Sequence, residues 1–515
     1  MALELLAPAR TPEVGRIALA CGADAVYVGG PAFGARRSAG NALVEVASLV
    51  QEAHRQGAKV YAALNTILFE EELEAARTLA WDLHGVGVDA LIVQDLAFLE
   101  LDLPPLPLHA STQAACDGAD KVAFLADSGF QRVILARELS LDEIRAVRRA
   151  APEVELEAFV FGALCVGESG RCGLGQALAG RSGNRGACVQ PCRWGWDLDD
   201  GSGHRWRTAE PLLSIRDLDA TGLLEDLADA GVRSFKVEGR MKDADYVKNA
   251  VGHVRRHLDG LLERRPDLGS PSGTTLGFVP DPRQTFNRGF TTYRLDGERR
   301  PLLSGAASGW LGTPLGSVEA LAGPTITLGD ATCLVAGDGL AWAGPGGRVV
   351  SATVLAVSGA EVRLDAVHQL SVGQPIYRNR DRRWLEALGQ ATPSGPPRRL
   401  RSSVGLTTRR VVPLPEVHLD HRWNLSNSRS RAFCLRRGAI TLESALELQD
   451  SAIGRELART WLCLRYELGA CPHHPHPTIP PPTEPLVEPL TLRSGPHTLV
   501  CTFDCVACRM RLQKR

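Results

Sequence analysis

Four cysteines lie within one 28-residue segment of the chain, a density that points to metal chemistry. They are Cys165, Cys172, Cys188 and Cys192, with the spacing C-x6-C-x15-C-x3-C. Crowded thiolates bind soft metals and iron–sulfur clusters. A four-cysteine zinc site more often has two C-x2-C pairs, so the wide first pair favours an iron–sulfur cluster. A zinc site and a set of unrelated thiols are the alternatives.

A second group of cysteines lies near the end of the sequence. Its members are Cys463, Cys471, Cys505 and Cys508. The final pair has the C-x2-C spacing that is typical of a zinc knuckle, whereas the first pair is more loosely spaced. We expect a structural zinc ion here, with free thiols or a second cluster as the alternatives.

The strands and helices that must position the first cysteine group are predicted to form a barrel. Short apolar runs alternate with amphipathic helical patterns, as is typical of buried parallel strands. The candidate strands are 3–8, 24–29, 59–65, 90–94, 106–111, 132–137, 156–162 and 233–239. Eight such units predict an α/β fold with a TIM-like (β/α)8 barrel. A doubly wound sheet is the alternative, but no glycine-rich phosphate loop opens the first helix.

Polar side chains follow several of these strands. The candidates for acid–base chemistry or anion binding are His109, Arg137, Glu138, Lys236, Glu238 and Arg240. In a barrel the carboxyl ends of the strands meet at one mouth, so these side chains would converge there. The long loop after the seventh strand carries the four cysteines to the same mouth, and loops of such length are usually functional.

The composition is that of a globular protein of several domains. The chain has 515 residues, is 44% hydrophobic and 23% charged, and carries a net charge of −1. We find neither a transmembrane run nor a signal peptide, so we expect a cytoplasmic protein with reduced thiols and no membrane contact. No overall field attracts nucleic acid, although local arginine clusters suit either solvated surface or an RNA phosphate track.

Composition shifts divide the chain into four parts. Residues 1–262 form the predicted barrel with its cysteine loop, and residues 263–390 read as a β-rich small barrel. Residues 391–412 are a basic linker. Residues 413–515 are predicted to form a C-terminal α/β domain with a cysteine-rich tail.

Several motifs resemble one known family. The segments EAFVFGALCVGESGRC, GRSGNRGACVQPCR and FKVEGRMKDADYV, together with HASTQ and VILAREL, resemble the collagenase-like peptidase family of barrel proteins. The amino-acid sequence of the cysteine loop is most similar to that of the branch that makes 5-hydroxycytidine in 23S rRNA. The resemblance covers nearly the whole chain.

The resemblance implies an RNA-modifying hydroxylase. It implies a 4Fe-4S cluster on the four loop cysteines and prephenate as a co-substrate. We expect rRNA, or alternatively tRNA, and an electron donor protein as partners. Hydroxylation of tRNA uridine, hydroxylation of a quinone precursor and peptidase activity are the alternatives. The sequence has neither H-E-x-x-H nor G-x-S-x-G, which disfavours a peptidase.

Two positions depart from the family pattern. Phe161 stands where we expect a histidine, and it can neither carry a proton nor bind a metal. Arg509 stands in the DCVACRM segment where an acidic residue is usual. These departures leave room for a different substrate.

Overall fold

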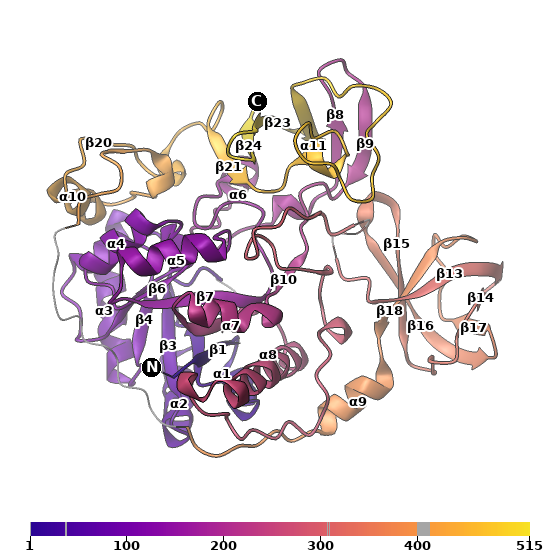
Figure 1. Cartoon of the computed structure of the whole chain (residues 1–515), viewed down its shortest axis with the longest axis horizontal. Helices are drawn as coiled ribbons and strands as arrows, with labels where there is room; N and C mark the ends of the chain where they lie inside the picture. Colours follow the sequence, from indigo (N-terminus) through magenta and orange to yellow (C-terminus); the bar gives the residue numbers. More distant parts are fainter. Residues whose placement is uncertain (1, 37–38, 306, 308, 399–411) are drawn as a thin grey trace.

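The computed structural model describes residues 2–36, 39–305, 307, 309–398 and 412–515. A large barrel occupies the first half of the chain, a small barrel stands to one side, and a C-terminal sheet lies over one end of the large barrel (Figure 1). Most of the predicted basic linker, residues 399–411, lies outside the described residues.

Among the described residues, eight parallel strands form a closed barrel. They are β1 (Glu4–Ala9), β2 (Ala25–Gly29), β3 (Lys59–Leu64), β4 (Ala90–Val93), β5 (Leu108–Ala110), β6 (Arg132–Ile134), β7 (Glu155–Gly162) and β11 (Val232–Val237). Neighbours pair in parallel in this order, and β11 closes the ring by pairing with both β7 and β1. The closed ring confirms the predicted TIM-like barrel and excludes the doubly wound sheet, whose edges stay open.

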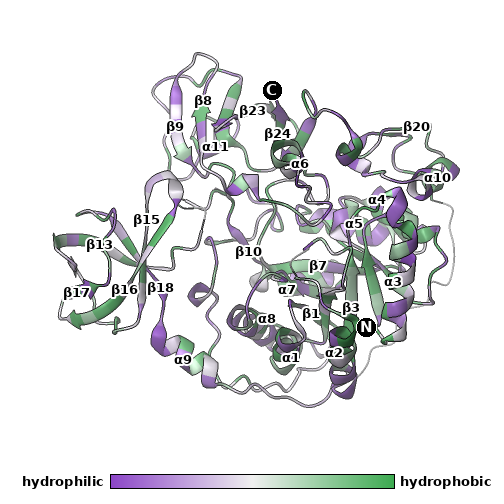
Figure 2. Cartoon of the chain, turned by 180° about the vertical axis from the view of Figure 1, so that it is seen from behind, coloured by the Kyte–Doolittle hydropathy of each residue, from purple (hydrophilic) through white to green (hydrophobic). Residues whose placement is uncertain are grey.

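Amphipathic helices cover the barrel. They are α1 (Pro12–Ala20), α2 (Leu43–Arg55), α3 (Leu73–Gly85), α4 (Ala119–Asp127), α5 (Leu141–Ala150), α7 (Leu224–Asp229) and α8 (Ala244–Arg264). Figure 2 shows the hydrophobic colour concentrated on the central strands, while the covering helices carry both colours. Side chains cap several helices, as when Ser140 and Glu143 form a capping box at the start of α5. None of the helices in the described part of the chain combines the length and apolar composition needed to cross a membrane.

A charged network fills the barrel interior below the mouth. Arg132 lies 2.7 Å from Glu4 and 2.9 Å from Glu157, and Lys236 lies 2.7 Å from the same Glu157. All four side chains are buried. Buried charges are costly unless they are paired and hydrogen-bonded, and this network pairs them. It therefore ties β1, β6, β7 and β11 together across the barrel.

In the described ranges, a second closed barrel of six antiparallel strands lies between residues 313 and 380. Its strands are β13 (Thr313–Ala322), β14 (Thr325–Leu328), β15 (Gly339–Ala343), β16 (Val349–Ser358), β17 (Glu361–Leu364) and β18 (Pro375–Arg380), followed by α9 (Arg382–Gln390). It has a hydrophobic core of its own around the buried Trp342. The predicted small β-barrel is confirmed.

The C-terminal sheet is built from two distant parts of the chain. Its order is β21 (Glu456–Thr460), β24 (Arg509–Lys514), β23 (His497–Asp504), β22 (Leu490–Ser494), β8 (Trp196–Asp199) and β9 (Arg205–Glu210). The strands β8 and β9 follow the cysteine loop directly, and Figure 1 shows them beside the yellow C-terminal strands. The short elements around it are α6 (Leu174–Ala179), β10 (Asp217–Asp219), β12 (Phe290–Thr291), β19 (His418–Leu419), α10 (Ser428–Arg436), β20 (Thr441–Leu442) and α11 (Leu464–Glu467).

Candidate active site at the barrel mouth

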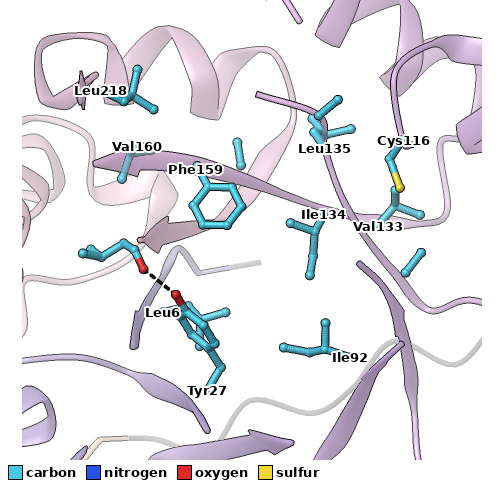
Figure 3. Close-up of a cluster of buried hydrophobic side chains, with 14 of the residues drawn as sticks. Leu6, Tyr27, Ile92, Cys116, Val133, Ile134, Leu135, Phe159, Val160 and Leu218 are labelled. Carbon is cyan, nitrogen blue, oxygen red and sulfur yellow. Dashed lines mark hydrogen bonds between the residues drawn. The ribbon is translucent and has the colours of Figure 1, made fainter. Parts of the chain in front are cut away.

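A cavity of 370 Å³ opens at the carboxyl ends of the barrel strands. Its floor is apolar, and Figure 3 shows the side chains of Tyr27, Ile92, Ile134 and Phe159 pointing toward one space. The hydroxyl of Tyr27 donates a hydrogen bond of 3.0 Å to the carbonyl of Val237, which fixes that ring. Barrel enzymes hold their active sites at this end, so the cavity is the candidate active site.

All four cysteines of the loop after β7 line this cavity. They are Cys165, Cys172, Cys188 and Cys192. A hydrogen bond from the thiol of Cys172, reinforced by the charge of Arg137, lowers the pKa of Cys165 to about 6. Burial raises the pKa of Cys192 to about 12. One thiol is therefore ionised at neutral pH, while a metal would have to displace the protons of the others.

The thiols of the cysteine loop share one cavity, and their ligand chemistry can be compared with that of a metal ion and of a cluster. Within the described ranges, no three His, Cys, Asp or Glu side chains are placed to share one metal ion. Each ligand of an iron–sulfur cluster binds a different iron, so its sulfurs stand further apart than the ligands of tetrahedral zinc. Four thiols around one cavity, one of them ionised, are suited to hold a soft metal or such a cluster.

Another part of the cavity lining, called the basic wall here, carries Arg36, Arg137 and Arg240. Arg137 lies 2.6 Å from Glu238, and Arg36 lies 3.7 Å from the same carboxylate. Burial would raise the pKa of Glu238, but Arg36 and Arg137 outweigh it and hold that pKa below its usual value. Burial and the nearby Arg36 lower the pKa of Arg240 to about 10, so Arg240 stays charged at neutral pH.

Arg240 has a donor that nothing in the described part of the chain accepts. Its side chain is buried, lines the cavity, and leaves its Nη1 without a hydrogen-bond partner. A buried charged donor without an acceptor is costly, and an anionic ligand in the cavity would satisfy it. The site is therefore suited to a carboxylate or a phosphate.

The six side chains predicted for acid–base chemistry or anion binding fall into two groups, one that lines the cavity and one that does not. Arg137, Lys236, Glu238 and Arg240 line the cavity, whereas His109 and Glu138 do not. His109 lies inside the barrel, 4.9 Å from the ring of Tyr61. Burial, together with Arg132, holds the pKa of His109 well below its usual value, so it stays neutral.

Glu138 holds the cysteine loop through hydrogen bonds to Ser169. Its carboxylate accepts hydrogen bonds from the backbone N–H of Ser169 at 2.8 Å and from the Ser169 hydroxyl at 2.9 Å. Burial raises the pKa of Glu138 to about 7. Ser169 precedes Cys172 by three positions in the sequence. Glu138 thus positions the loop and does not face the cavity.

Sequence reasoning missed three arginines of the site. Arg36, Arg181 and Arg288 line the cavity from loops that follow no predicted strand closely. Arg36 lies seven residues after the end of β2 at Gly29, so a search restricted to strand ends overlooks it. A search of whole loops at the barrel mouth would have found Arg36 and Arg181.

Phe161 lies in the apolar core beside the cavity. Its ring lies 5.6 Å from the ring of Phe290 and 5.6 Å from that of His253. It is 2% exposed and does not line the cavity. The residue that replaces the expected histidine therefore contributes packing at this position.

The tail cysteines lie at a turn of the C-terminal sheet and at the two ends of a short helix. Cys505 and Cys508 lie between β23 and β24, Cys463 precedes α11, and Cys471 follows it. An Nη1 of Arg299 donates to the sulfur of Cys508 at 3.0 Å. Here too, the described residues place no three His, Cys, Asp or Glu side chains around one ion. A structural zinc ion here stays a prediction.

The fold and the site agree with a family assignment. The model of peptidase family U32 matches residues 10–302, which include the cysteine loop and every described strand of the large barrel except β1 (Glu4–Ala9). The chain belongs to this family.

Two groups of relatives resemble the chain. The 23S rRNA 5-hydroxycytidine C2501 synthase of Escherichia coli is 44% identical over 75% of this chain and 60% of its own length. The tRNA hydroxylation protein P1 of Bacillus subtilis is 36% identical over 50% of this chain and 63% of its own length. The tRNA hydroxylation protein P of Escherichia coli is 33% identical over 51% of this chain and 69% of its own length. The chain thus spans about three-fifths of the length of the first two relatives.

Proposed function

We propose that this protein is an RNA hydroxylase that forms 5-hydroxycytidine in 23S rRNA. One observation carries the proposal: a single cavity is lined both by four cysteines and by a basic wall with the unpartnered Nη1 of Arg240. Such a cavity suits a redox group on one side and an anionic reactant on the other. Its volume falls within the range of small-molecule pockets, roughly 300–1,000 Å³.

The four loop cysteines would hold a 4Fe-4S cluster. Such a cluster supplies one-electron redox chemistry when it is bound. The chain supplies the thiolates, the ionised Cys165 being the first available ligand. The neighbouring Arg137 and Arg193 would offset the negative charge of a thiolate-bound cluster. We expect an external electron donor protein as the redox partner of such a cluster.

The basic wall would bind the anionic co-substrate, which we take to be prephenate. Arg240 would donate its free Nη1 to a carboxylate, and the planar guanidinium of Arg137 is already held in place by Glu238. Because Arg240 is buried, a carboxylate there is shielded from water and bound more strongly than at the surface.

The base would be extruded from its stack to reach the cavity. Enzymes that modify a base must take it out of the stack, and aromatic side chains then receive it. Phe159 and Tyr27 offer such rings on the cavity floor. Glu238 stays ionised beside them and is the acid–base candidate for moving a proton at the base.

The names of the relatives support hydroxylation of RNA and favour rRNA over tRNA. The relative named for 23S rRNA matches more of this chain than the two relatives named for tRNA do. The small barrel and the four C-terminal strands β21 to β24 lie beyond the family model and would supply RNA contacts. An rRNA-modifying enzyme of this kind would work in the cytoplasm.

Mass spectrometry of RNA nucleosides tests the proposal. We expect the 23S rRNA of a deletion strain to lose 5-hydroxycytidine and to regain it when the full chain is supplied. The cavity variant R240Q serves as the matched negative control. Unchanged rRNA with a loss of hydroxylated uridine in tRNA would assign the chain to the tRNA reaction instead.

A further inference from the structure

We infer that the C-terminal sheet is part of the cysteine site, and that Arg509, through its ion pair with Glu168, is a positioning residue that sets the reduction potential of the bound cluster. This inference rests on the proposed function, because it needs the cluster to be present. It assigns a role to a part of the chain that lies outside the family model, which ends at residue 302.

Strand β21 holds the backbone of the cysteine loop on both sides of Cys172. The N–H of Glu168 donates to the carbonyl of Arg459 at 2.9 Å, and the N–H of Gly173 donates to the carbonyl of Leu457 at 2.7 Å. Gly173 also packs closely here, because a Cβ at this position would lie 2.4 Å from a methyl group of Leu446 and that side chain would have to shift. The segment that presents Cys172 is thus fixed against the C-terminal sheet.

The other end of the loop continues into the same sheet. Soon after Cys192 the chain enters β8, where Leu198 pairs with Leu492 of β22. Trp196 and Leu198 of this strand are fully buried. In the middle of the loop, the Nζ of Lys514 donates to the carbonyl of Ala177 at 2.8 Å. The C-terminal sheet therefore contacts the loop at its beginning, middle and end.

One buried ion pair brings charge from the tail to this site. The Nη1 of Arg509 lies 2.5 Å from Glu168, and Arg171 lies 3.7 Å from the same carboxylate. Glu168 is 4% exposed and lines the cavity with the four cysteines. Its Oε2 has no hydrogen-bond partner among the described residues, so the carboxylate depends on these two guanidinium groups.

The sign of the effect follows from electrostatics. Reduction adds negative charge to a cluster, so a nearby carboxylate disfavours it and a nearby guanidinium favours it. Neutralising Glu168 should therefore raise the reduction potential. Neutralising Arg509 leaves Glu168 with less compensation and should lower it. A merely structural contact would not give opposite shifts for the two partners.

The test uses the full chain, purified without oxygen and reconstituted with iron and sulfide. The variants are E168Q, R509Q, R509K and the double variant E168Q/R509Q, and the control is R511Q. Arg511 lies on the same strand and pairs with Asp504 at 2.9 Å and with Glu456 at 3.6 Å, neither of which belongs to the cysteine loop. Iron and sulfide content and the midpoint potential are measured for each variant.

We expect a higher potential in E168Q, a lower one in R509Q, and the wild-type value in R509K and R511Q. Equal potentials in wild type, E168Q and R509Q, all with full iron content, would overturn the inference and leave the proposed function standing. If R509Q loses its iron, the double variant E168Q/R509Q should bind iron again, because removing both partners leaves no uncompensated buried charge. A double variant that also lacks iron would overturn the inference. A wild-type chain that binds no iron would instead overturn the proposed cluster and the inference with it.

Discussion

The chain carries two groups of four cysteines, and their surroundings differ. At the barrel mouth the thiols share one cavity with a basic wall, and a neighbouring thiol and Arg137 lower the pKa of Cys165 to about 6. At the tail the thiols flank a hairpin turn and a short helix, and burial raises the pKa of Cys463. The same residue type thus has different chemistry because the fold, and not the cysteine count, places charge and space around it.

Loss of a mouth cysteine should have the largest effect. Replacing Cys165 or Cys172 with serine is expected to abolish RNA hydroxylation and to remove most of the bound iron, since an alkoxide does not replace a thiolate in a cluster. Iron analysis and nucleoside mass spectrometry measure both. The matched variants C505S and C508S at the tail should keep full iron content at the mouth. Iron loss that is equal in both groups would abolish the distinction between them.

Removal of the unpartnered guanidinium should have the next largest effect. R240Q is expected to weaken binding of the anionic co-substrate by about 1.5–3 kcal/mol, or roughly 10- to 100-fold in kcat/KM, since a charge-assisted hydrogen bond is lost. The surface variant R205Q, whose ion pair with Asp197 is exposed, is the control. Steady-state kinetics with varied co-substrate concentration measure this effect. An unchanged KM for the co-substrate in R240Q would show that Arg240 does not bind it.

Stability of the mouth should depend on pH through Glu138. Its folded-state pKa of about 7 lies above the unfolded value, so the folded state binds the proton more tightly. The resulting stability, about 3 kcal/mol, is fully present below pH 4.5 and is lost as the pH rises through 7. E138Q should flatten this slope in denaturant titrations between these pH values. An identical slope in wild type and E138Q would contradict the assignment.

The tail should show the smallest effect on activity. We expect the full chain to hold one zinc ion there, and the double variant C505S/C508S to lose it with a lowered melting temperature and nearly unchanged hydroxylation. Zinc analysis of chains purified with and without a chelator measures the content. A chain free of zinc, with the same melting temperature in both forms, would assign these cysteines as free thiols.

The sequence predicts those parts of the fold that depend on short, continuous apolar segments. The eight barrel strands were predicted because buried parallel strands are continuous apolar runs, and the end of β11 revealed Lys236, Glu238 and Arg240 for the same reason. The joining of β8 to β22 could not be predicted, since the paired residues Leu198 and Leu492 are 294 positions apart in the sequence. His109 shows a further limit, because a pattern of strand ends does not reveal which side chains turn into the barrel interior.

The sheet that contains both β8 and β24 cannot be completed until the last strand of the chain has been synthesised. A ribosome completes the cysteine segment long before it reaches Arg509 and Lys514, the residues that contact that segment from the last strand. At roughly 5–20 residues per second the nascent chain spends some tens of seconds without this support. Under the proposed function, a cluster would therefore be inserted after translation has passed β24, when the cysteine segment first has all its contacts with the last strand.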